Sequence, residues 1–201
     1  GLGENHDGIL VLDASLQPGL SARELFQPAQ DWVFEIGLTP NHMDAMSHMG
    51  VARDVCALLN NQENTAVYSV RKPGIHAATK ASQPLNIGVE VKNTEACPRY
   101  CGQSITGVKV GQSPAWMQHR LQAIGIRPIN NIVDITNYVL HETGQPLHAF
   151  DADQIKGGKV VIQNLPTGTP FLSLVGKERK LDGGDLMICD AENNPMCIAG
   201  G

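Results

Sequence analysis

The feature that most constrains this fold is the segment of residues 126–151, which crowds polar side chains between apolar ones. Residues 131–141 are expected to form a helix, because apolar side chains recur there every three or four positions. Asn131 can cap this helix, Asp134 then takes its third position, and Gly144 can end it. So many polar groups beside an apolar stripe are unusual for a segment that only fills a core.

The residues after this helix form a turn signal, Gly-Gln-Pro at 144–146, followed by an extended run that carries Leu147, His148 and Phe150. The helix and the turn together are expected to bring an Arg, an Asn, a Gln and a His toward one region. These residues are Arg127, Asn137, Gln145 and His148. Such a set could grip a polar substrate.

The composition allows one or two ordinary globular domains. The chain has 201 residues, of which 42% are hydrophobic, enough for a real core. The formal charge of -5 argues against nucleic-acid binding through overall positive charge, so any RNA contact must be local. No run reaches the roughly 18 to 20 apolar residues that cross a membrane, and no signal peptide is recognisable. We therefore expect a soluble, cytoplasmic protein with neither a membrane nor DNA as a partner.

The sequence gives little support for a metal site or a disulfide framework. Five cysteines are an odd number and fit a reducing compartment, where buried free thiols are the simplest interpretation. Cys97 and Cys101 have the spacing of half a zinc site, but no second pair is near. His42, Asp44 and His48 offer too few ligands on one face, and a first-turn Asp is explained by helix capping. No metal ligand and no cofactor-binding residue is predicted, and the chain has no phosphate-binding glycine loop for ATP.

Apolar runs and turn residues predict an α+β fold. Helices are expected at residues 21–26, 113–125 and 131–141, and a further helix capped by Asn41, with Asp44 at its third position, carries apolar residues as far as Leu59. The basic cluster 177–180 is interpreted as a solvated hairpin turn. Strands are expected at residues 8–13, 32–38, 86–93, 100–110, 159–163, 171–175, 186–190 and 195–199.

Two long stretches resemble a known family. Residues 126–151 read IRPINNIVDITNYVLHETGQPLHAFD and are similar to the B3/B4 domain of the beta chains of bacterial phenylalanyl-tRNA synthetases. Residues 36–55 read IGLTPNHMDAMSHMGVARDV and resemble the B1 domain of the same chains. Residues 97–100 and 105–110 match the family's start of the B3 part. The two long motifs occur in the family's order, and the resemblance covers most of the chain.

The resemblance implies an organisation in three parts. Residues 1–62 would form a small, incomplete, winged-helix-like α/β B1 unit, residues 63–96 a linker with a leading strand, and residues 97–201 a mixed, β-rich B3/B4 editing domain with packed helices, truncated at its C-terminus. The chain would then be a piece of a longer beta chain. The whole enzyme would join phenylalanine to its tRNA with ATP and magnesium, as a heterotetramer of two alpha and two beta chains. No cofactor is expected in this part of it.

The family's B3/B4 domain hosts an editing site that hydrolyses tyrosine wrongly attached to the phenylalanine tRNA. A second site is needed because an apolar pocket cannot strongly reject an added hydroxyl group. The resemblance assigns His148 to water positioning or contact with the tRNA 3′ end. It also suggests a set of substrate-binding residues: Arg127, Thr136, Asn137, Gln145, Pro146, Gly200 and Gly201.

Simpler interpretations remain open for each of these residues. His148 could be a structural histidine whose two ring nitrogens bond to nearby backbone. Arg127 could be a solvated or ion-paired surface residue. No nucleophile with an adjacent base is recognisable, so water-mediated hydrolysis is preferred to covalent catalysis. The family's acidic residue for the tyrosine hydroxyl lies beyond Gly201, so the isolated piece is expected not to edit. The alternative function is a non-catalytic B3/B4-like module for RNA binding or subunit contact.

Overall fold

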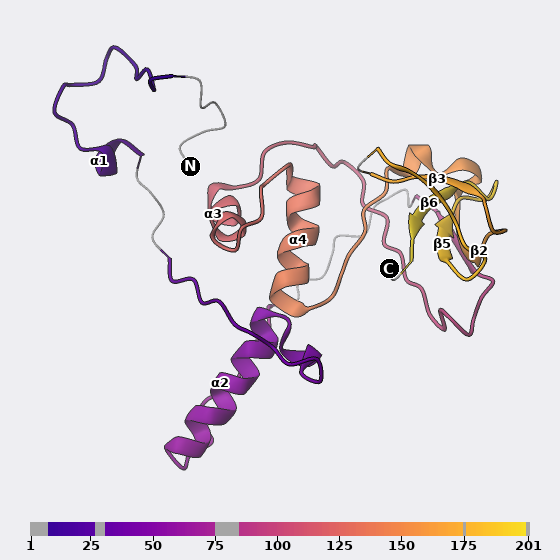
Figure 1. Cartoon of the computed structure of the whole chain (residues 1–201), viewed down its shortest axis with the longest axis horizontal. Helices are drawn as coiled ribbons and strands as arrows, with labels where there is room; N and C mark the ends of the chain where they lie inside the picture. Colours follow the sequence, from indigo (N-terminus) through magenta and orange to yellow (C-terminus); the bar gives the residue numbers. More distant parts are fainter. Residues whose placement is uncertain (1–7, 27–30, 75–84, 175, 200–201) are drawn as a thin grey trace.

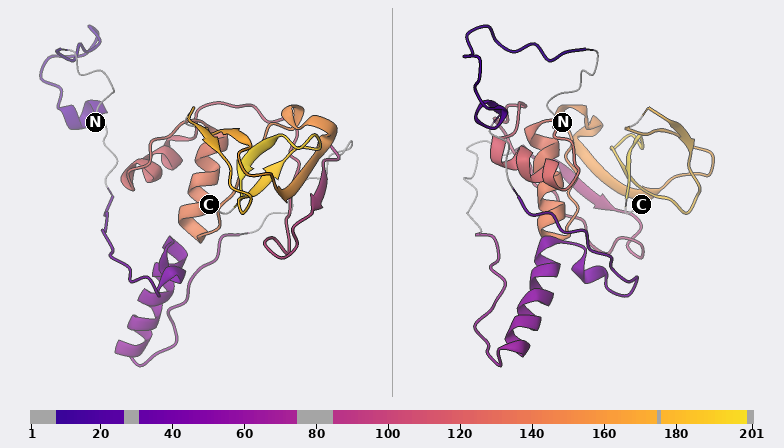
Figure 2. Two further views of the ribbon diagram at one scale, coloured as in Figure 1. Left: turned by 45° about the vertical axis from the view of Figure 1, so that its right-hand side comes forward. Right: turned by 60° about the vertical axis from the view of Figure 1, so that its left-hand side comes forward.

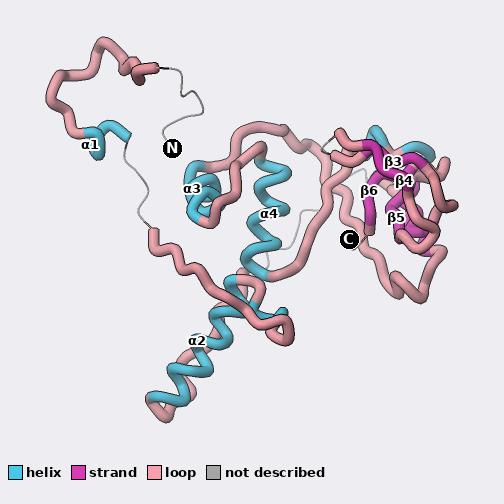
Figure 3. Tube along the Cα trace, viewed as in Figure 1, coloured by secondary structure: helices cyan, strands magenta, loops and turns pink. Residues whose placement is uncertain are grey.

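The computed structural model describes residues 8–26, 31–74, 85–174 and 176–199 (Figure 1). The helices are α1 Ala22–Phe26, α2 His48–Gln62, α3 Ala115–Ala123 and α4 Asn131–Thr143, with 3-10 turns η1 Met43–Ala45, η2 Ala152–Gln154 and η3 Lys156–Gly158. The strands are β1 Gly88–Val91, β2 Lys159–Asn164, β3 Pro170–Leu172, β4 Glu178–Lys180, β5 Leu186–Cys189 and β6 Pro195–Ile198. The α+β class predicted from the sequence is confirmed. Figure 3 shows helices α1 to α4 apart from the strands, and short helical turns beside the strand region.

Four strands form the main sheet, in the order β1-β2-β5-β6. β1 runs parallel to β2, with Gly88 opposite Lys159, whereas the pairs β2–β5 and β5–β6 are antiparallel. β3 and β4 form a separate antiparallel hairpin. The sheet thus joins a strand from the part expected as a linker to strands about 70 residues later in the chain, as the pairing of Gly88 with Lys159 shows.

The strands of the main sheet point successive side chains to opposite faces, and each face is covered by an apolar cluster. On one face Val161 and Met187 pack with Phe171 and Leu181 from the β3–β4 hairpin. On the other face Ile162 belongs to a second buried cluster. The other buried members of that cluster are Ile155, Val160 and Ile188. Most of the buried apolar residues of the described chain lie in these two clusters.

Helix α4 starts at Asn131, the first residue of the predicted range, but the predicted cap is wrong, and Asp134 is the fourth rather than the third residue after the cap. Its cap is Asn130, whose side-chain oxygen accepts hydrogen bonds from the backbone N–H groups of Ile132 and Val133. The expected cap, Asn131, instead bonds to the preceding loop, where its Nδ2 donates to the Lys109 carbonyl. Two adjacent asparagines offered the same capping chemistry, and the loop contact decided between them. Gly144 ends the helix with a φ of 81°, as predicted.

Helix α2 also differs at its start. Its cap is Ser47, which accepts from the Gly50 N–H, so the predicted cap Asn41 and the predicted position of Asp44 are both wrong. Residues 43–45 form the separate turn η1, which passes so close to α2 that a Cβ on Gly50 would lie 2.1 Å from the Asp44 carbonyl oxygen. Only glycine fits there. The predicted apolar face of α2 is half-buried rather than buried.

Three predicted strands are absent from the described residues. Residues 8–13, 32–38 and 100–110 carry no strand pairing, although their apolar residues alternate as a strand's would. A strand needs a hydrogen-bonded neighbour, and these segments find none in the described chain. Trp32 and Phe34 are consequently 88% and 78% exposed. The prediction that the basic cluster 177–180 forms a hairpin turn is also wrong. Residues 178–180 form strand β4, and the turn precedes them.

The remaining predictions for the fold fare better. Residues 22–26 are helical, and α3 lies within the range 113–125 predicted for it, with Pro114 at its cap position. Figures 1 and 2 show the end of α4 meeting the beginning of α2. There the Nδ1 atom of His48 lies 2.8 Å from the His141 carbonyl oxygen. The three domain ranges and the winged-helix resemblance stay predictions.

Candidate functional site

His148 lies in the extended segment that leads from α4 back to the sheet. Its Nδ1 atom is 3.7 Å from the Sγ atom of Cys197 on β6. Its ring centroid is 4.4 Å from that of Phe150, with the two rings tilted by 41°. The fold therefore holds one edge of the imidazole against the sheet, while the residue as a whole remains exposed.

The floor beneath His148 is apolar. Phe150, Cys197, Cys97 and Tyr100 all pack against the buried cluster around Ile162. The segment that carries Cys97 and Tyr100 is thereby placed over the same face of the sheet as the segment that carries Phe150. His148 thus contacts Phe150 and Cys197, two partly buried residues that themselves pack on the apolar cluster.

Partial burial sets the charge of this cluster. Desolvation lowers the pKa of His148 below its usual value of 6.5, which keeps the ring neutral near pH 7. Burial raises the pKa of the Cys197 thiol, with a smaller opposing effect from the backbone of Ile198. Burial, followed by the nearby Cys197 and Cys97, also raises the pKa of Tyr100. His148, Cys197 and Tyr100 are therefore uncharged at neutral pH and offer hydrogen-bonding groups rather than charges.

The other predicted site residues lie on several elements. Arg127 is exposed in the connection between α3 and α4, and Asn137 is half-buried in the middle of α4. The Thr136 hydroxyl donates to the Val133 carbonyl within α4, at 2.7 Å. Gln145 Nε2 donates to the Pro146 carbonyl in the turn after α4, at 3.1 Å. Thr136 and Gln145 thus use polar groups on local backbone, and Gly200 and Gly201 lie outside the described residues.

The sequence interpretation missed Cys197. It treated the five cysteines as buried free thiols, whereas Cys197 is half-buried and faces an imidazole from a segment about 50 residues away. The sequence did predict that Cys197 lies on a strand, at residues 195–199, and the structure forms β6 there. The contact between Cys197 and His148 could not be predicted, because it depends on how the segment after α4 returns to the sheet.

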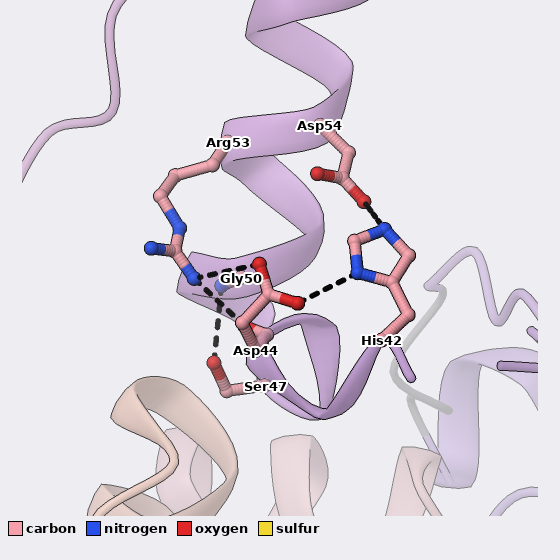
Figure 4. A network of polar contacts seen from close by, with 6 residues as sticks. All are labelled: His42, Asp44, Ser47, Gly50, Arg53 and Asp54. Atoms are coloured by element: carbon pink, nitrogen blue, oxygen red, sulfur yellow. Dashed lines mark hydrogen bonds and ion pairs between the residues drawn. The ribbon is translucent and has the colours of Figure 1, made fainter. Parts of the chain in front are cut away.

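A second polar network surrounds His42, as Figure 4 shows. The His42 ring lies between two carboxylates, with Nδ1 2.6 Å from Asp44 and Nε2 3.0 Å from Asp54. Arg53 donates to the Asp44 carbonyl oxygen at 2.8 Å, and its guanidinium is 3.6 Å from the Asp44 carboxylate. The hydrogen bond to Asp44 is the main cause of the raised pKa of His42. Asp44 therefore ties η1 to α2 rather than capping the helix.

This network does not resemble a metal centre. His42 directs its two nitrogens to different carboxylates, and His48 bonds to the end of α4 instead. Among the residues that the structure describes, no three His, Cys, Asp or Glu side chains are grouped to hold a metal ion. Two surface hollows, of about 440 and 270 Å³, are both lined by Arg71 and Glu142, and neither includes His148.

Comparison with known proteins identifies the C-terminal half of the chain. Residues 96–201 match the B3/4 domain family. The chain belongs to the B3/4 domain family. The match includes the site of His148 and Cys197, but it begins after β1, so the sheet of this B3/4 domain recruits a strand from outside the matched range.

Curated relatives match over the whole chain. It is 50% identical over 200 residues to the phenylalanine–tRNA ligase beta subunit of Bacteroides fragilis, and equally to that of Porphyromonas gingivalis. The Salinibacter ruber protein of the same name is 44% identical over 204 residues. All of this chain is covered in each case, but the chain spans only 24% of each relative's length. Within the described residues, none of the helices has the length and apolar character to span a bilayer.

Proposed function

We propose that this chain is part of a phenylalanine–tRNA ligase beta subunit. In this proposal the whole protein takes part in attaching phenylalanine to its tRNA in the cytoplasm, with ATP, magnesium and alpha subunits, in a complex of two alpha and two beta chains. The observation that carries the proposal is the 50% identity to two such subunits along the full length of this chain. The B3/4 match over residues 96–201 supports it independently.

We further propose that the B3/4 part hydrolyses tyrosine mischarged on the phenylalanine tRNA. The editing domain would extend over residues 97–201, after a B1-like unit at 1–62 and a linker at 63–96. His148 is suited to order the attacking water or to contact the 3′-terminal ribose, because its ring is neutral near pH 7 and can accept a proton.

The remaining residues would recognise the substrate. Arg127, exposed before α4, is suited to a phosphate of the tRNA 3′ end. Asn137 has a side-chain amide that can donate and accept. We assign Thr136 and Gln145 a supporting role, since they shape the helix and the turn on either side. Pro146 stiffens the turn, and Gly200 and Gly201 are proposed as further substrate-binding residues.

The test is hydrolysis of tyrosyl-tRNA by the complete synthetase. We expect His148→Ala to lower the rate by about a hundredfold, in the range of a lost acid–base group. Arg127→Ala should mainly raise KM. The matched control is His119→Ala, an exposed histidine on α3 whose loss should leave hydrolysis unchanged. Unchanged rates in both site variants would remove the assignment of the site to His148 and Arg127. A wild-type synthetase that does not hydrolyse tyrosyl-tRNA would remove the editing proposal and favour a non-catalytic module for RNA or subunit contact.

A further inference from the structure

The contact between Cys197 and His148 has a direction that the hydrogen bonds of Cys197 determine. The Cys197 Sγ–H donates to the carbonyl oxygen of Ile198, at 3.2 Å. The thiol has a single proton, so it cannot donate to His148 at the same time. The sulfur therefore faces the imidazole as an acceptor. A hydrogen bond across the 3.7 Å gap then requires the proton to be on Nδ1 of His148.

We propose that Cys197 is a positioning residue that fixes the tautomer of His148, with the proton on Nδ1 and the lone pair on Nε2. Among the described residues, Nε2 has no hydrogen-bond partner. Its lone pair is available to a water or hydroxyl group. The Phe150 ring, whose centroid is 4.4 Å away and whose plane is tilted by 41°, limits rotation of the imidazole out of this orientation. The kinetic importance of this tautomer rests on the proposed editing function, whereas the tautomer itself does not.

An alternative arrangement would make Cys197 a thiolate nucleophile paired with an imidazolium. The surroundings oppose both charges, since burial raises the pKa of Cys197 and lowers that of His148. The apolar cluster beneath them supplies no charge that would stabilise an ion pair. The neutral pair is the form that this environment favours. Cys197 therefore orients the base and does not attack the substrate.

The tautomer can be measured directly on the 201-residue chain with ¹⁵N-labelled histidine. Long-range ¹H–¹⁵N spectra at pH 8 distinguish a protonated from a bare nitrogen at each position of the ring. The His148 signals are assigned by their loss in His148→Gln. We expect the wild type to hold mainly the Nδ1–H form, whereas free imidazole side chains favour Nε2–H. A wild type with mainly Nε2–H would overturn the proposal.

Two variants separate the hydrogen bond from packing. Cys197→Ser keeps a group that can donate to Ile198 and accept from Nδ1–H, so it should keep the Nδ1–H form. Cys197→Val fills the strand position without an acceptor and should return His148 to the Nε2–H form. Equal tautomer populations in the Ser and Val variants would contradict the positioning role, whether both resemble the wild type or both depart from it.

The complete synthetase supplies a separate kinetic readout. Cys197→Val should lower the kcat of tyrosyl-tRNA hydrolysis by about tenfold with little change in KM, and Cys197→Ser should restore most of it. If His148→Ala abolishes hydrolysis but Cys197→Val does not lower it, the positioning role fails. If the NMR result holds but His148→Ala leaves hydrolysis unchanged, the tautomer stands and the proposed role of His148 in editing fails. If the NMR result holds but the wild-type synthetase does not hydrolyse tyrosyl-tRNA, the tautomer stands and the proposed editing function fails.

Discussion

The main sheet and helix α2 make an informative comparison, because both lie in stretches whose sequence resembles the same family. In the sheet, Ile162 and Met187 are completely buried, and two apolar clusters cover both faces. In α2 the described structure buries only Gly50, and Val55 and Leu58 are 47% and 55% exposed. A strong sequence motif thus need not coincide with a local core. His148 contacts the main sheet, which is the region that has a buried core.

The largest difference between the two regions should appear in core truncations. Ile162→Ala removes a completely buried side chain and should destabilise the chain by about 2–5 kcal/mol. Leu58→Ala removes a side chain that is 55% exposed and should change stability by no more than about 0.5 kcal/mol. Urea unfolding followed by circular dichroism measures both. Equal losses would mean that α2 contributes as much packing as the sheet.

The next largest loss of stability is expected from removing the buried carboxylate of Asp134. Asp134 is 1% exposed and accepts hydrogen bonds from the Ser113 hydroxyl and from the Ile129 N–H, which tie α4 to the segment before α3 and to its own preceding loop. Asp134→Ala leaves these donors unsatisfied and should cost about 1–3 kcal/mol in urea unfolding. Asp134→Asn retains an acceptor for Ile129 and should cost less. An Asn variant as unstable as the Ala variant would show that charge, rather than the hydrogen bonds, matters.

The helix cap gives a smaller effect. Asn130→Ala removes the side chain that bonds the first N–H groups of α4 and should destabilise it by about 1 kcal/mol. Asn130→Asp caps equally well and should remain within a few tenths of a kcal/mol of the wild type. Thermal unfolding monitored in the far ultraviolet distinguishes these outcomes. No loss in the Ala variant would return the capping role to Asn131.

The smallest effect concerns the exposed network at α2. Asp44 raises the pKa of His42 in the folded chain, so this network stabilises most fully below the unfolded pKa near 6.5. The contribution is lost as the pH rises through the higher pKa of the folded state. His42→Arg keeps the cation between Asp44 and Asp54 and should remove this pH dependence. A histidine titration by NMR that gives His42 an ordinary pKa in the wild type would contradict the account.

The sequence predicted the parts of the fold that local chemistry determines. The end of α4 at Gly144 followed from the glycine itself, and β2 and β5 followed from short apolar runs between turns. The strand expected at 32–38 failed because alternation does not reveal whether a partner strand is present. Cys197 was missed for a related reason. Its contact with His148 joins two segments whose meeting depends on the complete path of the chain.

The central claim is that the sheet β1-β2-β5-β6 forms the stable frame on which His148 is held, while α2 depends on packing from elsewhere. Native-state amide hydrogen exchange of the 201-residue chain tests this most directly. We predict the slowest exchange at Val161, Ile162 and Ile188, protection of β1 together with them, and much faster exchange throughout α2. Protection of α2 equal to that of β2 and β5, or unprotected amides in these strands, would contradict the claim.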